Sequence, residues 1–94
     1  MQSKGKRAPT KAERAHIERI KRMSCVICCA PGPSDAHHIK QDSGWHCVPL
    51  CQSCHTGRNG IHGERHMWKL KKMDEVDALA ATVELLVNED KGRR

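Results

Sequence analysis

Residues 25–28, Cys-Val-Ile-Cys, and residues 51–54, Cys-Gln-Ser-Cys, decide the fold of this 94-residue chain. Each short loop can wrap two sulfurs around one ion at about 2.3 Å, and four thiolates complete the tetrahedral shell of Zn²⁺. We therefore predict a structural zinc site formed by Cys25, Cys28, Cys51 and Cys54. Cys29 or Cys47 could replace a neighbour in that shell, through Cys25/Cys29 or Cys47/Cys51, but two intervening residues are the commoner spacing.

The small size of the chain leads us to expect a stabilising metal site. A domain of 94 residues without Phe or Tyr, and with only two Trp, has a core that contributes a small net stability. We expect zinc to replace much of what aromatic burial would contribute. We divide the chain into a basic arm at residues 1–9, one zinc-containing domain at 10–90 and a tail at 91–94.

The net charge of +6 is unevenly distributed along the chain. Residues 1–23 hold eight Lys or Arg and two Glu, so this segment accounts for the whole excess, and the remainder is neutral. A basic segment on a neutral body is typical of phosphate binding, although a solvated helix face has the same composition. We interpret it as a surface for nucleic acid.

Cysteine usage and hydropathy indicate a reducing compartment. The paired cysteine spacing is that of a metal site, and no apolar signal stretch precedes it, so we do not expect disulfides. No apolar run is long enough to span a bilayer. We expect a cytoplasmic protein with no membrane partner.

Sequence patterns predict a small α+β fold. Thr10 and Glu13 form a capping-box signature, which predicts a helix over residues 10–23 with a basic outer face. Residues 36–40 and 45–50 read as the strands of a hairpin, and Cys51 begins the helix that follows. This hairpin and helix form a ββα unit held by the zinc site.

Two further helices are predicted after this unit, over residues 64–72 and 74–88. The second is amphipathic, with apolar residues at three- and four-residue steps: Val76, Leu79, Ala80, Val83, Leu86 and Val87. The stripe is either core or a dimer face. We expect it to pack against the zinc-bearing body, because a chain this short has few other apolar surfaces to cover.

Histidines next to the cysteine pairs can form a second metal site. His37 and His38 are consecutive on the first predicted strand, and His55 arrives from the following helix. Four cysteines already fill the zinc shell, so these imidazoles are available for other chemistry.

These motifs resemble a known family. Ala36-His37-His38-Ile39, followed by Val48-Pro49-Leu50 and the Cys-x-x-Cys-His of residues 51–55, is similar to the HNH branch of the ββα-metal (His-Me finger) endonucleases. Residues 11–16 (Lys-Ala-Glu-Arg-Ala-His) and 59–63 (Asn-Gly-Ile-His-Gly), with Trp68, resemble more closely the phage recombination-enhancement, RecA-dependent nucleases. The resemblance extends from residue 11 to about residue 87.

The resemblance implies roles for individual residues. His38 would be the general base that activates water, and His37 and His55 would hold one divalent cation, Mg²⁺, Mn²⁺ or another. The family pattern has an asparagine that orients the base, where this chain has His46, which can donate a similar hydrogen bond. The further metal ligand is His62 or Asn59, and we favour His62 because imidazole is the better ligand for transition metals.

The function implied is metal-dependent DNA endonuclease activity, with nicking as one form and phage recombination or DNA processing as its setting. A recombinase filament is a candidate partner, and the bacterial or phage-infected cell is the location. The alternative is a non-catalytic zinc-finger module that binds nucleic acid or a recombination protein. The chain would act as a monomer or homodimer. From composition, the DNA contacts would be Lys4, Lys6, Arg7, Lys11, Lys40 and Arg58.

Overall fold

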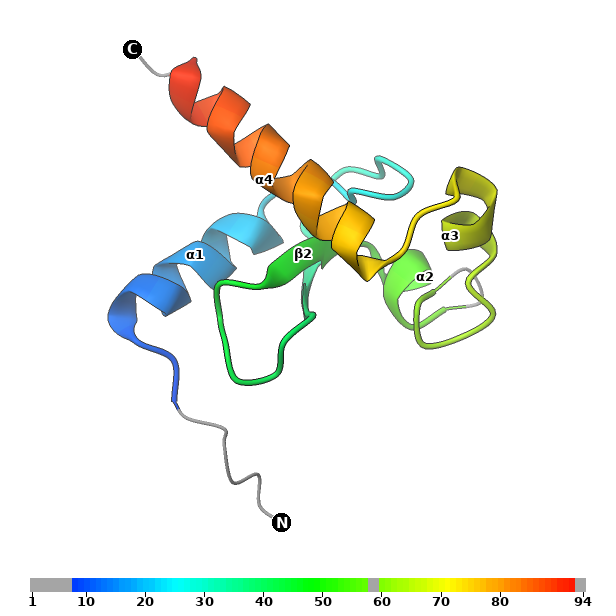
Figure 1. Ribbon diagram of the computed structural model, residues 1–94, viewed down its shortest axis with the longest axis horizontal. Coiled ribbons are helices and arrows are strands. Elements are labelled where there is room, and N and C mark those ends of the chain that lie inside the picture. Colours follow the sequence, from blue (N-terminus) through cyan, green and yellow to red (C-terminus); the bar gives the residue numbers. More distant parts are fainter. Residues whose placement is uncertain (1–7, 58–59, 93–94) are drawn as a thin grey trace.

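An antiparallel hairpin of two strands lies at the centre of the structure, and three of the helices contact it (Figure 1). The computed structural model describes residues 8–57 and 60–92. Helix α4 begins near α2, crosses the hairpin and extends beyond it on the side of α1, whereas α2 and α3 lie on the opposite side (Figure 1). The elements in chain order are α1 (Lys11–Lys21), β1 (Asp35–His38), β2 (Cys47–Leu50), α2 (Gln52–His55), α3 (His66–Lys71) and α4 (Glu75–Lys91).

The register of the hairpin determines which way the two adjacent histidines point. His37 pairs with Val48 and His38 pairs with Cys47, so both lie in regular strand and their side chains leave opposite faces. The strands are shorter than predicted, since Ile39 and Trp45 lie outside them, although the Ile39 amide still donates to the His46 carbonyl at 2.8 Å. The predicted hairpin followed by a helix is present, as β1, β2 and α2.

The hydrophobic core is continuous with the cysteines. Cys25 and Cys54 are buried in the same cluster as the large apolar side chains, which are Ile27, Val48, Leu50, Ile61 and Trp68. The indole of Trp68 donates its Nε1 hydrogen to the Cys54 carbonyl at 2.9 Å, so the one polar group of this side chain is paired. Trp68 is therefore a core residue, and a change at the cysteines is transmitted directly to the core.

Helix α1 is fixed to the hairpin loop by a buried carboxylate. The Glu13 side chain accepts from the Thr10 amide at 2.8 Å, and Thr10 Oγ1 accepts from the Glu13 amide at 3.1 Å, which confirms the predicted capping box. The second Glu13 oxygen accepts from the Gly44 amide at 3.0 Å. One buried side chain thus starts the helix and positions the loop between β1 and β2.

Glu13→Ala is expected to lower the free energy of unfolding by roughly 2 kcal/mol, because it removes a cap and leaves the buried Gly44 amide without its acceptor. Urea unfolding followed by circular dichroism measures this loss. Glu18→Ala, on the exposed face of the same helix, is the matched control. Equal midpoints for the two variants would contradict the structural role given to Glu13.

The last helix packs against the rest of the domain as predicted, but only part of the predicted stripe faces the core. In α4 the buried residues are Ala78 and Thr82, and Leu79 of the stripe packs against the core, whereas Val76 and Val83 are 69% and 50% exposed. Small residues let α4 approach β2 closely, and the Thr82 hydroxyl is satisfied by the Ala78 carbonyl at 2.8 Å. Periodicity detected the helix, but the side that packs is the one with small side chains.

The far end of α4 is attached to α1 by charge. Arg19 Nη2 lies 2.6 Å from Glu89 Oε1 and 2.7 Å from Asp90 Oδ1. These partly exposed pairs contribute little individually, but they orient α4 across the hairpin.

No helix within residues 8–57 and 60–92 is long and apolar enough to cross a bilayer. Most of the predicted basic arm, with Lys4, Lys6 and Arg7, lies outside the described residues.

Candidate metal centres

The four cysteines of the two Cys-x-x-Cys pairs converge as predicted. The sulfurs of Cys25, Cys28, Cys51 and Cys54 all lie within 4.8 Å of one another, and those of Cys28 and Cys51 are 3.6 Å apart. A tetrahedral ion with bonds of about 2.3 Å separates its sulfur ligands by about 3.8 Å. The cluster therefore has dimensions that fit a structural metal such as zinc.

Local backbone structure points amides at these sulfurs. The Cys28 amide donates to Cys25 Sγ at 3.5 Å, and the Cys54 amide donates to Cys51 Sγ at 3.4 Å, so each pair forms the same turn. Cys51 is also the N-cap of α2. The turns place both sulfurs of a pair on one side of the backbone.

Ionisation of one buried thiol in the cluster opposes ionisation of another. Burial raises the pKa of Cys25, but amides that include that of Cys28 outweigh it and lower the pKa to about 7. Burial, and then the charge of Cys25, raises the pKa of Cys54. One thiolate forms readily and opposes the next, which is the behaviour expected of a site completed by a metal ion.

The two remaining cysteines lie apart from this cluster. Burial raises the pKa of Cys47 to about 11, so its thiol stays neutral, and Sγ donates to the Gly44 carbonyl at 3.4 Å. Cys29 is exposed and has a φ of 66°, in the left-handed turn that closes the first cysteine pair. Neither replaces a neighbour in the four-sulfur cluster.

Three histidines form a second cluster. Ring nitrogens of His37, His55 and His62 lie within 4.8 Å of one another. The ring centroids are 5.1, 5.1 and 5.0 Å apart, so the rings form a nearly equilateral triangle. Nδ1 of His37 is 3.3 Å from Nε2 of His55, which equals the spacing of about 3.3 Å for two imidazoles on a tetrahedral ion with bonds near 2.05 Å.

Three different segments supply these rings. His37 is buried on β1, His55 ends α2, and His62 is exposed in the turn that follows. The turn folds back because the amides of Ile61 and His62 donate to the carbonyls of Cys54 and His55. Gly60 is required there, since a Cβ would lie 2.5 Å from the His55 carbonyl oxygen. His62 thus lies where the third metal ligand was expected. The alternative ligand, Asn59, lies outside the described residues.

Two carboxylates contact the outer edges of these rings, and we did not predict either. His37 Nε2 lies 2.6 Å from Glu75 Oε2, and His55 Nδ1 lies 3.0 Å from Asp35 Oδ2. Burial lowers the pKa of His37, and this outweighs the hydrogen bond to Glu75. Asp35 precedes His37 by two residues and shares its strand face, which was a usable signal. Glu75 lies on α4, and nothing in the sequence indicated that it would reach His37.

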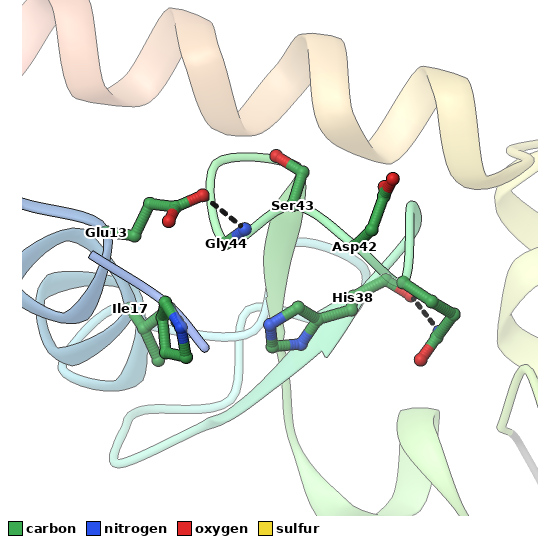
Figure 2. A pocket seen from close by; sticks show the side chains of 8 residues that line it. Glu13, Ile17, His38, Asp42, Ser43 and Gly44 are labelled. Atoms are coloured by element: carbon green, nitrogen blue, oxygen red, sulfur yellow. Dashed lines mark hydrogen bonds between the residues drawn. The ribbon is translucent and has the colours of Figure 1, made fainter. Parts of the chain in front are cut away.

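His38 faces a different part of the surface. Its side chain lines a pocket of about 320 Å³ between α1 and the hairpin loop, together with Pro9, Glu13, Ile17, Gln41, Asp42, Ser43 and Gly44. Figure 2 shows its imidazole directed toward α1, with Glu13 and Ile17 on the facing side. The predicted base and the three-histidine cluster therefore lie on opposite faces of β1, one residue apart.

His46 is hydrogen-bonded to Ser43. It is exposed, and its Nδ1 lies 2.7 Å from Ser43 Oγ. Among the described residues, no hydrogen bond joins the imidazoles of His46 and His38, so the orienting role expected of position 46 is not formed in this structure.

The predicted DNA contacts are only partly described. Lys11 is exposed at the start of α1. Lys40 is exposed in the hairpin loop, with Nζ 3.1 Å from Asp42 Oδ1. Arg58 lies outside the described residues, like the three basic residues of the arm.

Comparisons with known proteins add no identification to this geometry. No protein-family profile matches the chain, and neither a curated protein nor a solved structure matches it significantly.

Proposed function

We propose that this protein is a metal-dependent DNA endonuclease of the HNH type, in which the four cysteines hold a structural zinc and the three histidines hold a catalytic ion. The observation that carries the proposal is the cluster of His37, His55 and His62, with His62 exposed to solvent. Three protein ligands with an open side are typical of catalytic rather than structural sites.

The donor set also bears on which ion would bind. Neutral imidazoles favour transition metals such as Zn²⁺, Co²⁺, Ni²⁺ or Mn²⁺ over Mg²⁺, which prefers oxygen ligands. When bound, such an ion stabilises charge on the phosphoryl and leaving oxygens, an effect of several kcal/mol. We therefore expect activity with Mn²⁺ or Co²⁺ to exceed that with Mg²⁺.

His38 is the residue we propose to move the proton. An imidazole is a suitable general base near neutral pH, and this group would take a proton from the attacking water. His38 leaves the opposite face of β1 from His37, so this role requires a phosphodiester bound at the edge of the strand, within reach of both imidazoles. The basic segment at residues 1–23 would hold the flanking backbone phosphates. The resemblance suggests phage recombination as the setting.

A second candidate function is a non-catalytic zinc finger that binds nucleic acid. The contact of His46 with Ser43 favours it, because the expected orienting partner of His38 is then engaged elsewhere. This candidate predicts salt-sensitive DNA binding without cleavage in any divalent ion.

Cleavage of supercoiled plasmid separates the two candidates. The parent protein is expected to nick the plasmid with Mn²⁺ or Co²⁺, and His38→Ala is expected to be slower by about 10²–10⁴-fold. His66→Ala, an exposed histidine on α3, is the matched control and should cut like the parent. Equal rates for His38→Ala and the parent would remove His38 from the mechanism, and binding without any cutting would favour the zinc finger.

A further inference from the structure

The two outer carboxylates determine which nitrogen of each ring faces the cluster. A carboxylate oxygen accepts hydrogen bonds, so these contacts favour the tautomers in which His37 Nε2 and His55 Nδ1 carry the ring protons that point at Glu75 and Asp35. A neutral imidazole has one N–H and one lone pair. The remaining nitrogens, His37 Nδ1 and His55 Nε2, therefore present lone pairs to each other.

These two lone pairs are 3.3 Å apart. When both rings are neutral in these tautomers, no hydrogen lies between the two nitrogens, and two acceptors at this distance repel each other unless a cation lies between them. A ring nitrogen of His62 lies within 4.8 Å of both, so three potential metal-ligand atoms surround the same point. The carboxylates thus turn a group of three histidines into one that is ready for a cation.

We propose that Glu75 and Asp35 are positioning residues that fix the tautomer and ring orientation of His37 and His55 for metal binding. This rests on the catalytic ion of the proposed function, but it concerns affinity for that ion and not cleavage. Outer carboxylates of this kind hold the ligand ring in place and make its metal-facing nitrogen more basic.

Glu75 has the larger role of the two. Its partner His37 is buried, and the Glu75 side chain is 39% exposed against 54% for Asp35, so its hydrogen bond is better shielded from water. Glu75 is the first residue of α4, where the reciprocal capping bonds of Asp74 and Asp77 fix the first turn. Ala78 then anchors the helix in the core. The packing of α4 on the core therefore determines whether Glu75 can reach His37.

The test is Co²⁺ titration of the full-length protein with zinc already in the four-cysteine site. Cobalt at three histidines is followed by its visible bands, and the absence of thiolate charge-transfer bands shows that the cysteine zinc is not exchanged. Glu75→Ala is expected to weaken Co²⁺ binding by about 10–100-fold, and Asp35→Ala by less. Glu75→Gln keeps an acceptor oxygen, so it should lose less than Glu75→Ala.

Glu84→Ala, which removes an exposed carboxylate from the same helix, is the control for charge and should bind Co²⁺ like the parent. Long-range ¹H–¹⁵N spectra of the zinc-loaded protein give a second readout: His37 should be protonated at Nε2 in the parent, and this preference should be lost in Glu75→Ala but not in Glu84→Ala. A purely structural role for Glu75 would not move this signal.

Two results would overturn the inference: Co²⁺ affinity in Glu75→Ala and Glu75→Gln equal to that of Glu84→Ala, or a parent His37 protonated at Nδ1. Failure of the proposed function looks different. A parent whose Co²⁺ affinity depends on these carboxylates but which cuts no DNA would leave the positioning roles intact and remove the nuclease.

Discussion

Replacement of Cys54 by serine is expected to release the bound zinc and unfold the chain. Structural zinc contributes about 10–16 kcal/mol in small zinc-dependent domains, which is as large as the whole stability of most single domains. Cys54 also lies in the hydrophobic core, and its carbonyl accepts from the Ile61 amide and from the Trp68 indole, each at 2.9 Å. Loss of the zinc would therefore disorganise the core as well as the two cysteine turns.

Circular dichroism and metal analysis of the purified protein measure this effect. Cys29→Ser is the matched control, because Cys29 is exposed and outside the four-sulfur cluster, so zinc content and helicity should match those of the parent. A strong chelator added to the parent should reproduce the Cys54→Ser result. A helical, cooperatively folded Cys54→Ser protein would show that the core is sufficient without the metal.

If the proposed function holds, replacement of His55 by alanine is expected to abolish DNA cleavage while the fold and any zinc held by the four cysteines remain. His55 supplies one of the three ring nitrogens and is only partly buried at the end of α2, so its removal leaves a small surface gap. Loss of the catalytic ion removes several kcal/mol of transition-state stabilisation, which corresponds to about 10³-fold or more in rate.

Plasmid nicking and metal counting test this prediction together. The parent should hold one tightly bound zinc and one exchangeable ion, and His55→Ala should hold the first alone. Gln52→Ala, an exposed change on the same short helix, should retain both ions and full activity. Unchanged cleavage by His55→Ala would place the chemistry away from the three-histidine cluster.

The parts of the structure that depend on local sequence could be predicted. The capping box at Thr10 and Glu13, the hairpin followed by a helix, and the convergence of four cysteines all follow from short-range spacing. The meeting of His37, His55 and His62 was expected from the family resemblance, with a Gly-containing turn that lets the chain bend back to place His62.

The parts that depend on the packing of distant segments could not be predicted. Glu75 reaches His37 only because α4 crosses the hairpin, and nothing near residue 75 in the sequence indicates that. The side of α4 that packs was predicted only in part: Leu79 packs on the core, but the periodicity of large apolar residues did not identify Ala78 and Thr82, whose small side chains suit close approach of a helix to a strand. The Ser43 contact of His46 depends in the same way on the detailed course of the hairpin loop.

The adjacency of Cys54 and His55 has a consequence for how the protein would acquire its metals. One residue belongs to the four-sulfur cluster and the next to the three-histidine cluster, and the carbonyls of both hold the turn that carries His62. If both clusters hold ions, the histidine site cannot assemble until the cysteine site has closed around its own. Loading would therefore be sequential, and a cell short of zinc would accumulate unfolded chains rather than a folded protein lacking only its catalytic ion.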